Sequence, residues 1–145
     1  MRSIRRILLV AGVSLALSAL VPTVSASSSK TFHLDKTCPS AILCTVISSG
    51  FSAIPAGTDI TYAYDDSDPW DGLAFPTITV RNGTTSGVCD WFQPAGPVLA
   101  KCTFDGGTGR LTQFHLTVDV TVTGDPNDSA SVWHWDGVYA FGSDS

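Results

Sequence analysis

The chain has 145 residues, of which 13 are aspartate, none is glutamate and eight are lysine or arginine. Its formal net charge of −5 becomes −8 without the first 26 residues, because three of the eight basic residues lie there. Proteins that bind nucleic acid or an anionic membrane surface need a positive field. The composition therefore argues against both kinds of partner.

The first 26 residues have the organisation of a secretory signal peptide. Three arginines in the first six residues precede an apolar run from Ile7 to Leu20, and the small-residue sequence Val24-Ser25-Ala26 follows as a cleavage signal. The apolar run is shorter than the ~20 residues that a membrane span needs. We expect residues 1–26 to be removed and the protein to be secreted.

The remaining 119 residues are enough for one domain with its own core. After a flexible leader at residues 27–31, we expect one domain over residues 32–142. Helical periodicity is absent, and Thr, Val, Gly and Asp dominate, as strands and turns require. The pattern predicts an all-β, antiparallel barrel or sandwich with strands near 32–35, 42–49, 58–65, 73–81, 86–92, 98–104, 110–123 and 131–142.

All four cysteines lie outside the predicted signal peptide. An even number in a small secreted domain indicates two disulfides, and sequence proximity favours Cys38–Cys44 and Cys89–Cys102 among three possible pairings. Their spacing does not fit a zinc site, so we expect no metal on these residues.

The last two strands show the clearest alternation of apolar and polar residues. Their apolar faces match in a register that pairs Val122 with Trp133, and therefore Asp119 with Asp136 on the polar face. The inward aromatic residues of these strands are candidates for lining a ligand cavity: Phe114, Trp133, Trp135 and Tyr139.

The polar face of the same two strands has two interpretations. Asp119, His134 and Asp136 could form an acid–base or metal-binding cluster, with His115 further along. The alternative is a solvated outer face on which the carboxylates diverge, and this is the interpretation that we favour.

The segment from Asp65 to Gly72 is the densest acidic stretch. Its oxygens could hold calcium, but its spacing does not follow an EF-hand, so we expect a solvated turn and no metal or cofactor. Trp70 in this stretch, together with Trp91, could instead present aromatic rings to a polysaccharide.

Two strings in the second half, Cys102-Thr-Phe-Asp-Gly-Gly-Thr-Gly-Arg-Leu111 and Trp135-Asp-Gly-Val-Tyr-Ala-Phe141, resemble the allene oxide cyclase and dirigent barrel superfamily. The similarity covers about residues 42–142 and is greatest to the small secreted bacterial relatives. It implies an eight-stranded antiparallel barrel with an apolar central cavity, often trimeric. Since the chain contains no glutamate, a family role assigned to a glutamate has no candidate here, and no catalytic residue is transferred.

Three functions follow from these observations. The leading hypothesis is a secreted, disulfide-bonded barrel that binds a hydrophobic or phenolic small molecule, because small eight-stranded barrels can hold one ligand. A homo-oligomer is a further expectation, from the trimers of the family that the chain resembles. The second is an extracellular polysaccharide- or surface-binding module. The third is a cyclase-type isomerase, which the missing glutamate weakens.

The glycine-rich segment Gly106-Gly107-Thr108-Gly109 is interpreted as a structural turn. Reversing the chain within a few residues requires positive φ, which glycine adopts freely. Thr108 is expected to form its hydrogen bond locally, within the turn.

Overall fold

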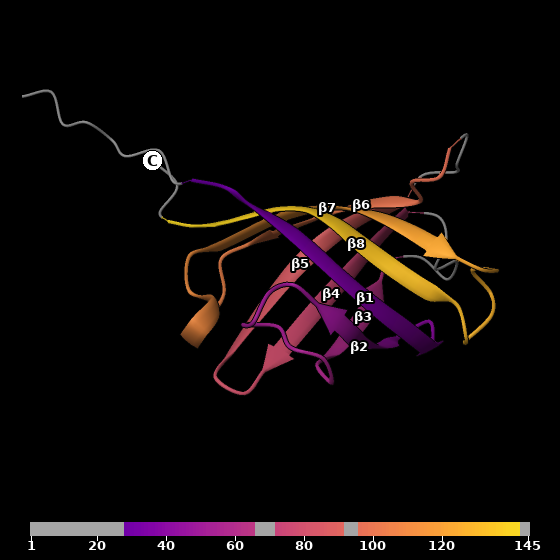
Figure 1. Ribbon diagram of the computed structural model, residues 1–145, viewed down its shortest axis with the longest axis horizontal. Helices are drawn as coiled ribbons and strands as arrows, with labels where there is room; N and C mark the ends of the chain where they lie inside the picture. Colours follow the sequence, from indigo (N-terminus) through magenta and orange to yellow (C-terminus); the bar gives the residue numbers. More distant parts are fainter. Residues whose placement is uncertain (1–27, 66–71, 92–95, 143–145) are drawn as a thin grey trace, which may run out of the picture.

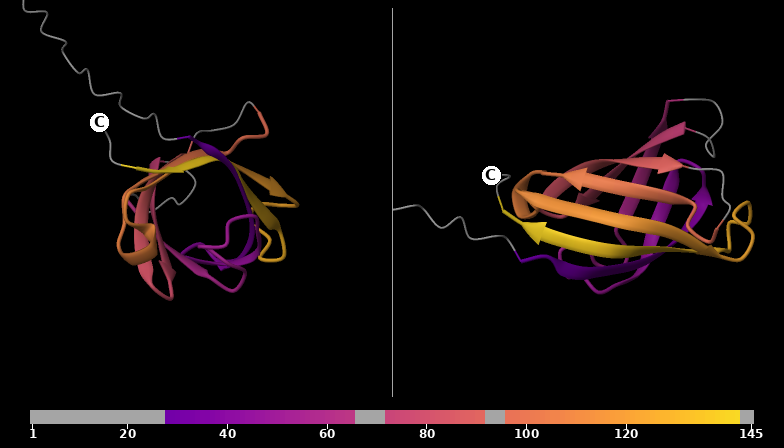
Figure 2. Two further views of the ribbon diagram at one scale, coloured as in Figure 1. Left: turned by 60° about the vertical axis from the view of Figure 1, so that its left-hand side comes forward. Right: turned by 90° about the horizontal axis from the view of Figure 1, so that it is seen from above.

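The computed structural model describes residues 28–65, 72–91 and 96–142, which form a closed antiparallel barrel (Figures 1 and 2). Each strand pairs with the next one in sequence, and β8 pairs with β1 to close the barrel. The strands are β1 (Lys30–Ser40), β2 (Leu43–Ser49), β3 (Asp59–Tyr64), β4 (Gly72–Val80), β5 (Gly83–Trp91), β6 (Ala100–Asp105), β7 (Phe114–Thr123) and β8 (Val132–Phe141).

The eight-stranded antiparallel barrel predicted from the sequence is confirmed, and the alternative of a sandwich is wrong. The predicted register of β7 and β8 is also confirmed, since Val122 lies opposite Trp133 and Asp119 opposite Asp136. Alternation suffices to fix this register because a slip of one residue would turn every apolar side chain outward.

Two elements differ from the sequence prediction. Strand β1 begins at Lys30, inside the expected leader of residues 27–31, and extends to Ser40, well beyond residue 35, while residues 110–113 do not belong to β7. Instead, the short 3-10 helix η1 (Gly109–Leu111) precedes Gln113, whose φ of 57° ends any extended run before Phe114. Leu111, the apolar residue that suggested a strand, lies in this helix and its side chain is fully buried.

The glycine-rich segment packs against a remote hairpin. The Thr108 N–H donates to the Thr84 carbonyl at 2.8 Å, and the Thr84 N–H donates to the Thr108 hydroxyl at 3.1 Å. The Thr85 hydroxyl donates to the Gly106 carbonyl at 2.6 Å. The prediction of a local hydrogen bond for Thr108 was wrong, because residues 24 apart in sequence meet here.

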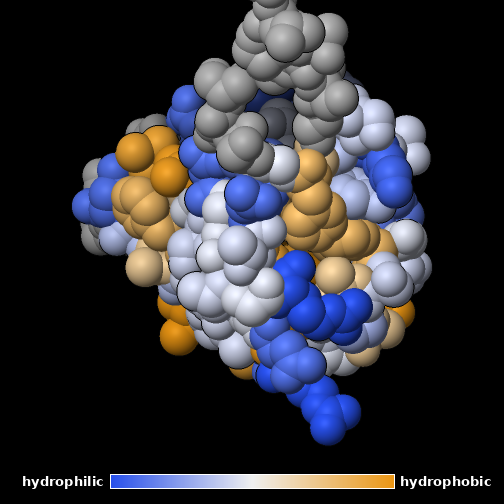
Figure 3. Space-filling view, turned by 90° about the vertical axis from the view of Figure 1, so that its left-hand side faces the viewer, coloured by the Kyte–Doolittle hydropathy of each residue, from blue (hydrophilic) through white to orange (hydrophobic). Residues whose placement is uncertain are grey.

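One end of the barrel is closed by the loop between β2 and β3. This loop buries Phe51 and Ile54, and the Phe51 ring stacks on Phe114 with centroids 5.4 Å apart. Tyr139 and Phe141 pack against the same ring. The end of the barrel that carries η1 faces the viewer in Figure 3, where apolar surface alternates with hydrophilic surface. Aromatic packing therefore fills the interior at the closed end.

Both disulfides lie in the barrel, and they join Cys38 to Cys44 and Cys89 to Cys102. The first links β1 to β2, and the second links directly paired positions of β5 and β6.

Replacing both Cys89 and Cys102 by alanine should lower the free energy of unfolding by about 3 kcal/mol, because the bond no longer restricts the unfolded chain. Urea denaturation followed by tryptophan fluorescence measures this change. The matched double variant of Cys38 and Cys44 opens a shorter loop, 6 rather than 13 residues apart, and should lose less. Equal stability of the wild type and the Cys89/Cys102 variant would contradict the expectation.

Candidate functional site

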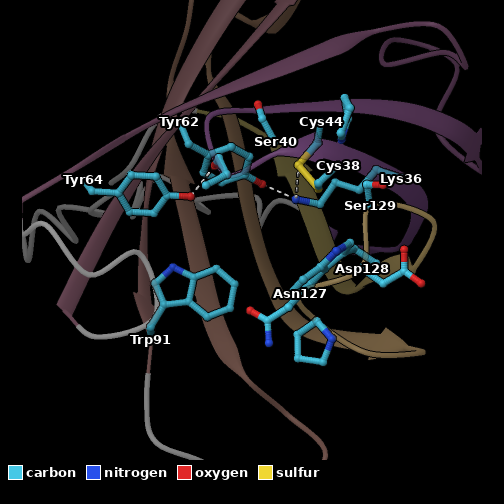
Figure 4. Close-up of a pocket in the computed structure, with 14 residues that line it drawn as sticks. Lys36, Cys38, Ser40, Cys44, Tyr62, Tyr64, Trp91, Asn127, Asp128 and Ser129 are labelled. Carbon is cyan, nitrogen blue, oxygen red and sulfur yellow. Dashed lines mark hydrogen bonds between the residues drawn. A yellow bond between two sulfur atoms is a disulfide. The ribbon is translucent and has the colours of Figure 1, made fainter.

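A cavity of about 270 Å³ opens at the barrel end opposite the Phe51 cluster (Figure 4). Strand ends and the β7–β8 loop contribute its walls, and Lys36 lies at its inner end. The lining residues are Lys36, Cys38, Pro39, Ser40, Ala41, Cys44, Tyr62, Tyr64, Trp91, Pro126, Asn127, Asp128, Ser129 and Trp133.

Strand β1 directs Lys36 into the barrel. Inward positions of this strand alternate with outward ones, so that Phe32, Leu34 and Lys36 are buried in turn. The antiparallel pairing with β8 sets Leu34 opposite Trp135 and Lys36 opposite Trp133. Only 3% of Lys36 is exposed, which is unusual for a lysine without an acidic partner.

The Lys36 amine has polar and aromatic neighbours. Its Nζ donates a hydrogen bond to the Tyr62 hydroxyl, and the sulfur of Cys44 lies 3.7 Å away. The same nitrogen lies 4.6 Å from the centre of the Tyr62 ring and 4.4 Å from the ring of Trp135. Ring faces attract a cation, but they replace only part of the hydration that the amine loses.

No carboxylate of the described residues lies within ion-pair distance of the Lys36 amine. Burial therefore lowers the pKa of Lys36 from its ordinary value of 10.5 to about 7. Burial also raises the pKa of Tyr62 well above 10, with a smaller contribution from Tyr64. The inner end of the cavity thus holds a neutral phenol beside an amine that is partly unprotonated at neutral pH.

Aromatic rings form the walls around this polar pair. Trp91 meets Trp133 edge to face with centroids 5.9 Å apart, and Tyr62 stacks on Tyr64 at 6.3 Å. The Tyr64 hydroxyl donates to the Ala41 carbonyl at 2.5 Å, which fixes the ring at the rim. An apolar enclosure with a few convergent polar groups is the usual form of a small-molecule site.

The four aromatic residues predicted to bind ligand occupy three different places. Trp133 lines the cavity, and Trp135 is buried beside Lys36. Phe114 is fully buried in the closed aromatic end, away from this cavity. Tyr139 contacts the same closed end and lines a second, open cavity of about 400 Å³ formed by β6, β7, β8 and Ser29.

The polar residues of β7 and β8 lie on the outer face of the barrel. Asp119 and Asp136 face each other, but Asp119 pairs with Lys101 at 3.3 Å and Asp136 pairs with His33 at 2.6 Å. The side chains of both aspartates are about half exposed, at 47% and 58%. Each carboxylate therefore has a separate cationic or imidazole partner.

The two other histidines of this face, His134 and His115, also contact aspartates. His134 contacts Asp35 at 2.6 Å, and His115 contacts Asp105 at 2.6 Å. Within residues 28–65, 72–91 and 96–142, no group of three acidic, histidine or cysteine side chains is arranged to hold a metal. His33 also contacts Asp35 at 3.2 Å, so His134 and Asp136 are linked through Asp35 and His33, whereas Asp119 pairs separately with Lys101.

The acidic segment falls mostly outside the described residues, as do Trp70 and the predicted signal peptide. Its first residue, Asp65, accepts a hydrogen bond from the Leu73 N–H at 2.9 Å, which ties the start of the segment to β4. Trp91 lies in the cavity wall.

Sequence reasoning missed the central residues of the site, Lys36, Tyr62 and Tyr64. The available signal was the alternation Phe32, Leu34, Lys36 and Cys38, which assigns the lysine to an inward position. Ending the first strand at residue 35 concealed that signal. The meeting of Lys36 with Tyr62, 26 residues away, depends on the closed barrel.

The described part of the chain contains no helix with the length and apolar composition of a membrane span. No family model matches the chain, and neither a curated protein nor a solved structure shows significant similarity to it.

Proposed function

We propose that this protein is secreted and binds a small aromatic molecule, hydrophobic or phenolic, in the cavity that contains Lys36. The observation that carries the proposal is the combination of an aromatic enclosure with one buried amine and one buried phenol at its inner end. Two disulfides are consistent with an oxidising compartment outside the cytosol. The proposed kinship with allene oxide cyclase and dirigent barrels agrees with this function but is not needed for it.

The cavity limits the ligand to a small molecule. A dry cavity of about 150 Å³ accommodates benzene, so 270 Å³ has room for one ring with a short substituent. Trp91, Trp133 and Tyr64 supply flat apolar contact, while the Lys36–Tyr62 pair offers a hydrogen bond to a ligand hydroxyl. Such a ligand would lose little by leaving water, because both of its parts find partners.

Isothermal titration calorimetry with 4-hydroxybenzyl alcohol tests this proposal. Trp91→Ala removes one wall of the cavity and should weaken binding about tenfold, the equivalent of one lost aromatic contact. Phe141→Ala truncates a partly exposed aromatic residue of the closed end and should change the affinity less than about twofold.

Equal effects of the Trp91 and Phe141 substitutions would contradict the location of the site. The alternative function, a polysaccharide-binding module, receives separate support if a soluble polysaccharide binds and the phenolic alcohol does not. A cyclase-type reaction is not part of the proposal, because the chain contains no glutamate.

A further inference from the structure

The Lys36 amine is enclosed, lacks a charged partner among the described residues and forms part of the cavity surface. Most lysines extend their ammonium group into water, where it is strongly hydrated. Here β1 holds the group between the rings of Tyr62 and Trp135, at 4.6 and 4.4 Å. A ligand ring in the cavity would lie next to a nucleophilic atom as well as a hydrogen-bond donor.

We propose that Lys36 forms a reversible imine with a small aromatic aldehyde, so that the site captures carbonyl compounds covalently. The inference rests on the proposed function, since the aldehyde has to occupy the same cavity. It extends that function by specifying the ligand's reactive group and the atom that binds it.

The reaction needs an unprotonated amine and a place for one proton. Burial of Lys36 lowers its pKa to about 7, so a large fraction of the amine keeps its lone pair at neutral pH. The lone pair attacks the carbonyl carbon, and the C=O π electrons move to the oxygen. Transfer of one N–H proton to that oxygen gives a neutral carbinolamine.

The second step expels water. The C–O bond breaks while the nitrogen lone pair forms the C=N bond, and the departing oxygen takes a second proton to leave as water. The Tyr62 hydroxyl, hydrogen-bonded to Nζ, is placed to give a proton to the oxygen and to recover the one that nitrogen releases. Amine and aldehyde are thereby converted into imine and water, without an oxidant or a reductant.

Burial, and no charged neighbour among the described residues, sets the protonation of Lys36. The Tyr62 phenol is protonated at neutral pH, because burial moves its pKa even further above its ordinary value of 10, and Cys44 is held in a disulfide. Asp128 lines the same cavity from the β7–β8 loop but forms no ion pair with Nζ. Thus no described carboxylate holds the proton on the amine.

The test combines 4-hydroxybenzaldehyde with sodium cyanoborohydride at pH 7, using the full secreted chain. Hydride reduction converts the imine into a stable secondary amine, and intact-mass measurement followed by peptide mapping locates it. Among the lysines we expect the adduct on Lys36, with at least about tenfold less on Lys101, whose exposed side chain lies outside the cavity that would hold the aldehyde. Lys36→Met should abolish the adduct.

Calorimetry with 4-hydroxybenzyl alcohol, which has no carbonyl, separates the two proposals. Alcohol binding without a Lys36 adduct would overturn the imine and leave the proposed function standing. Absence of both alcohol binding and adduct would overturn both. Adducts confined to Lys30 and Lys101 would also overturn the imine proposal. This outcome is measured on the wild-type chain, so it does not depend on the folding of any variant.

Discussion

Lys36→Met is expected to raise the free energy of unfolding by roughly 3–5 kcal/mol at pH 6, where the wild-type amine is charged while buried. The pKa of Lys36 is about 7 in the folded protein, against an ordinary value of 10.5. Between these values the unfolded chain binds more protons than the folded one, so wild-type stability rises with pH. Below pH 7 the full cost of the buried charge is present, and the unbranched methionine avoids it.

Urea denaturation at pH 6, 7, 8 and 9 measures the effect. The wild type should gain about 2 kcal/mol from Lys36 between pH 7 and pH 9, and this gain should be missing from the variant. His33 acts in the opposite sense, because its hydrogen bond to Asp136 raises its pKa and stabilises the fold at low pH. His33 is present in both proteins, so the difference between the two curves isolates Lys36.

Lys101→Met is the matched control, since that lysine is 56% exposed on the outer face. Its stability curve should run parallel to that of the wild type. Parallel curves for Lys36→Met and the wild type would show that the buried amine carries no such cost.

Gly109→Ala is expected to destabilise the barrel by roughly 3 kcal/mol or more. Gly109 has a φ of +56°, and an added Cβ would lie 2.0 Å from the Asn82 carbonyl oxygen. That carbonyl accepts a hydrogen bond from the Arg110 N–H at 2.7 Å. The methyl group would have to displace the backbone of the β4–β5 turn and break this contact.

Gly106→Ala separates the effect of conformation from that of collision. Gly106 also has positive φ, +78°, but nothing lies within 4 Å of an added Cβ. Its substitution should cost only about 1 kcal/mol. Chemical denaturation measures both losses, and the affinity for 4-hydroxybenzyl alcohol per folded molecule should be unchanged in each. Equal losses of stability in Gly109→Ala and Gly106→Ala would contradict a packed contact between η1 and the β4–β5 turn.

The local pattern of the sequence determined the strand class and the pairing of the last two strands. Alternation is a property of consecutive residues, and a pleated strand turns it directly into two faces, so Val122 opposite Trp133 could be predicted. Both disulfides join cysteines that are close in sequence, which is why proximity favoured the pairs that the structure contains. The sequence also determined that the Lys36 side chain points inward, because Lys36 follows Phe32 and Leu34 at every second position of β1.

Tertiary structure decided which inward residues pack and which surround space. Phe51 reaches the interior from a loop that has no strand periodicity, and it joins Phe114 to fill one end of the barrel. Barrel closure brings β1 beside β8, so that Asp136 meets His33 although 103 residues separate them. The same closure places Lys36 beside Tyr62, and burial inside the barrel lowers the pKa of the amine. No run of neighbouring residues encodes such burial, because it depends on every strand of the barrel at once.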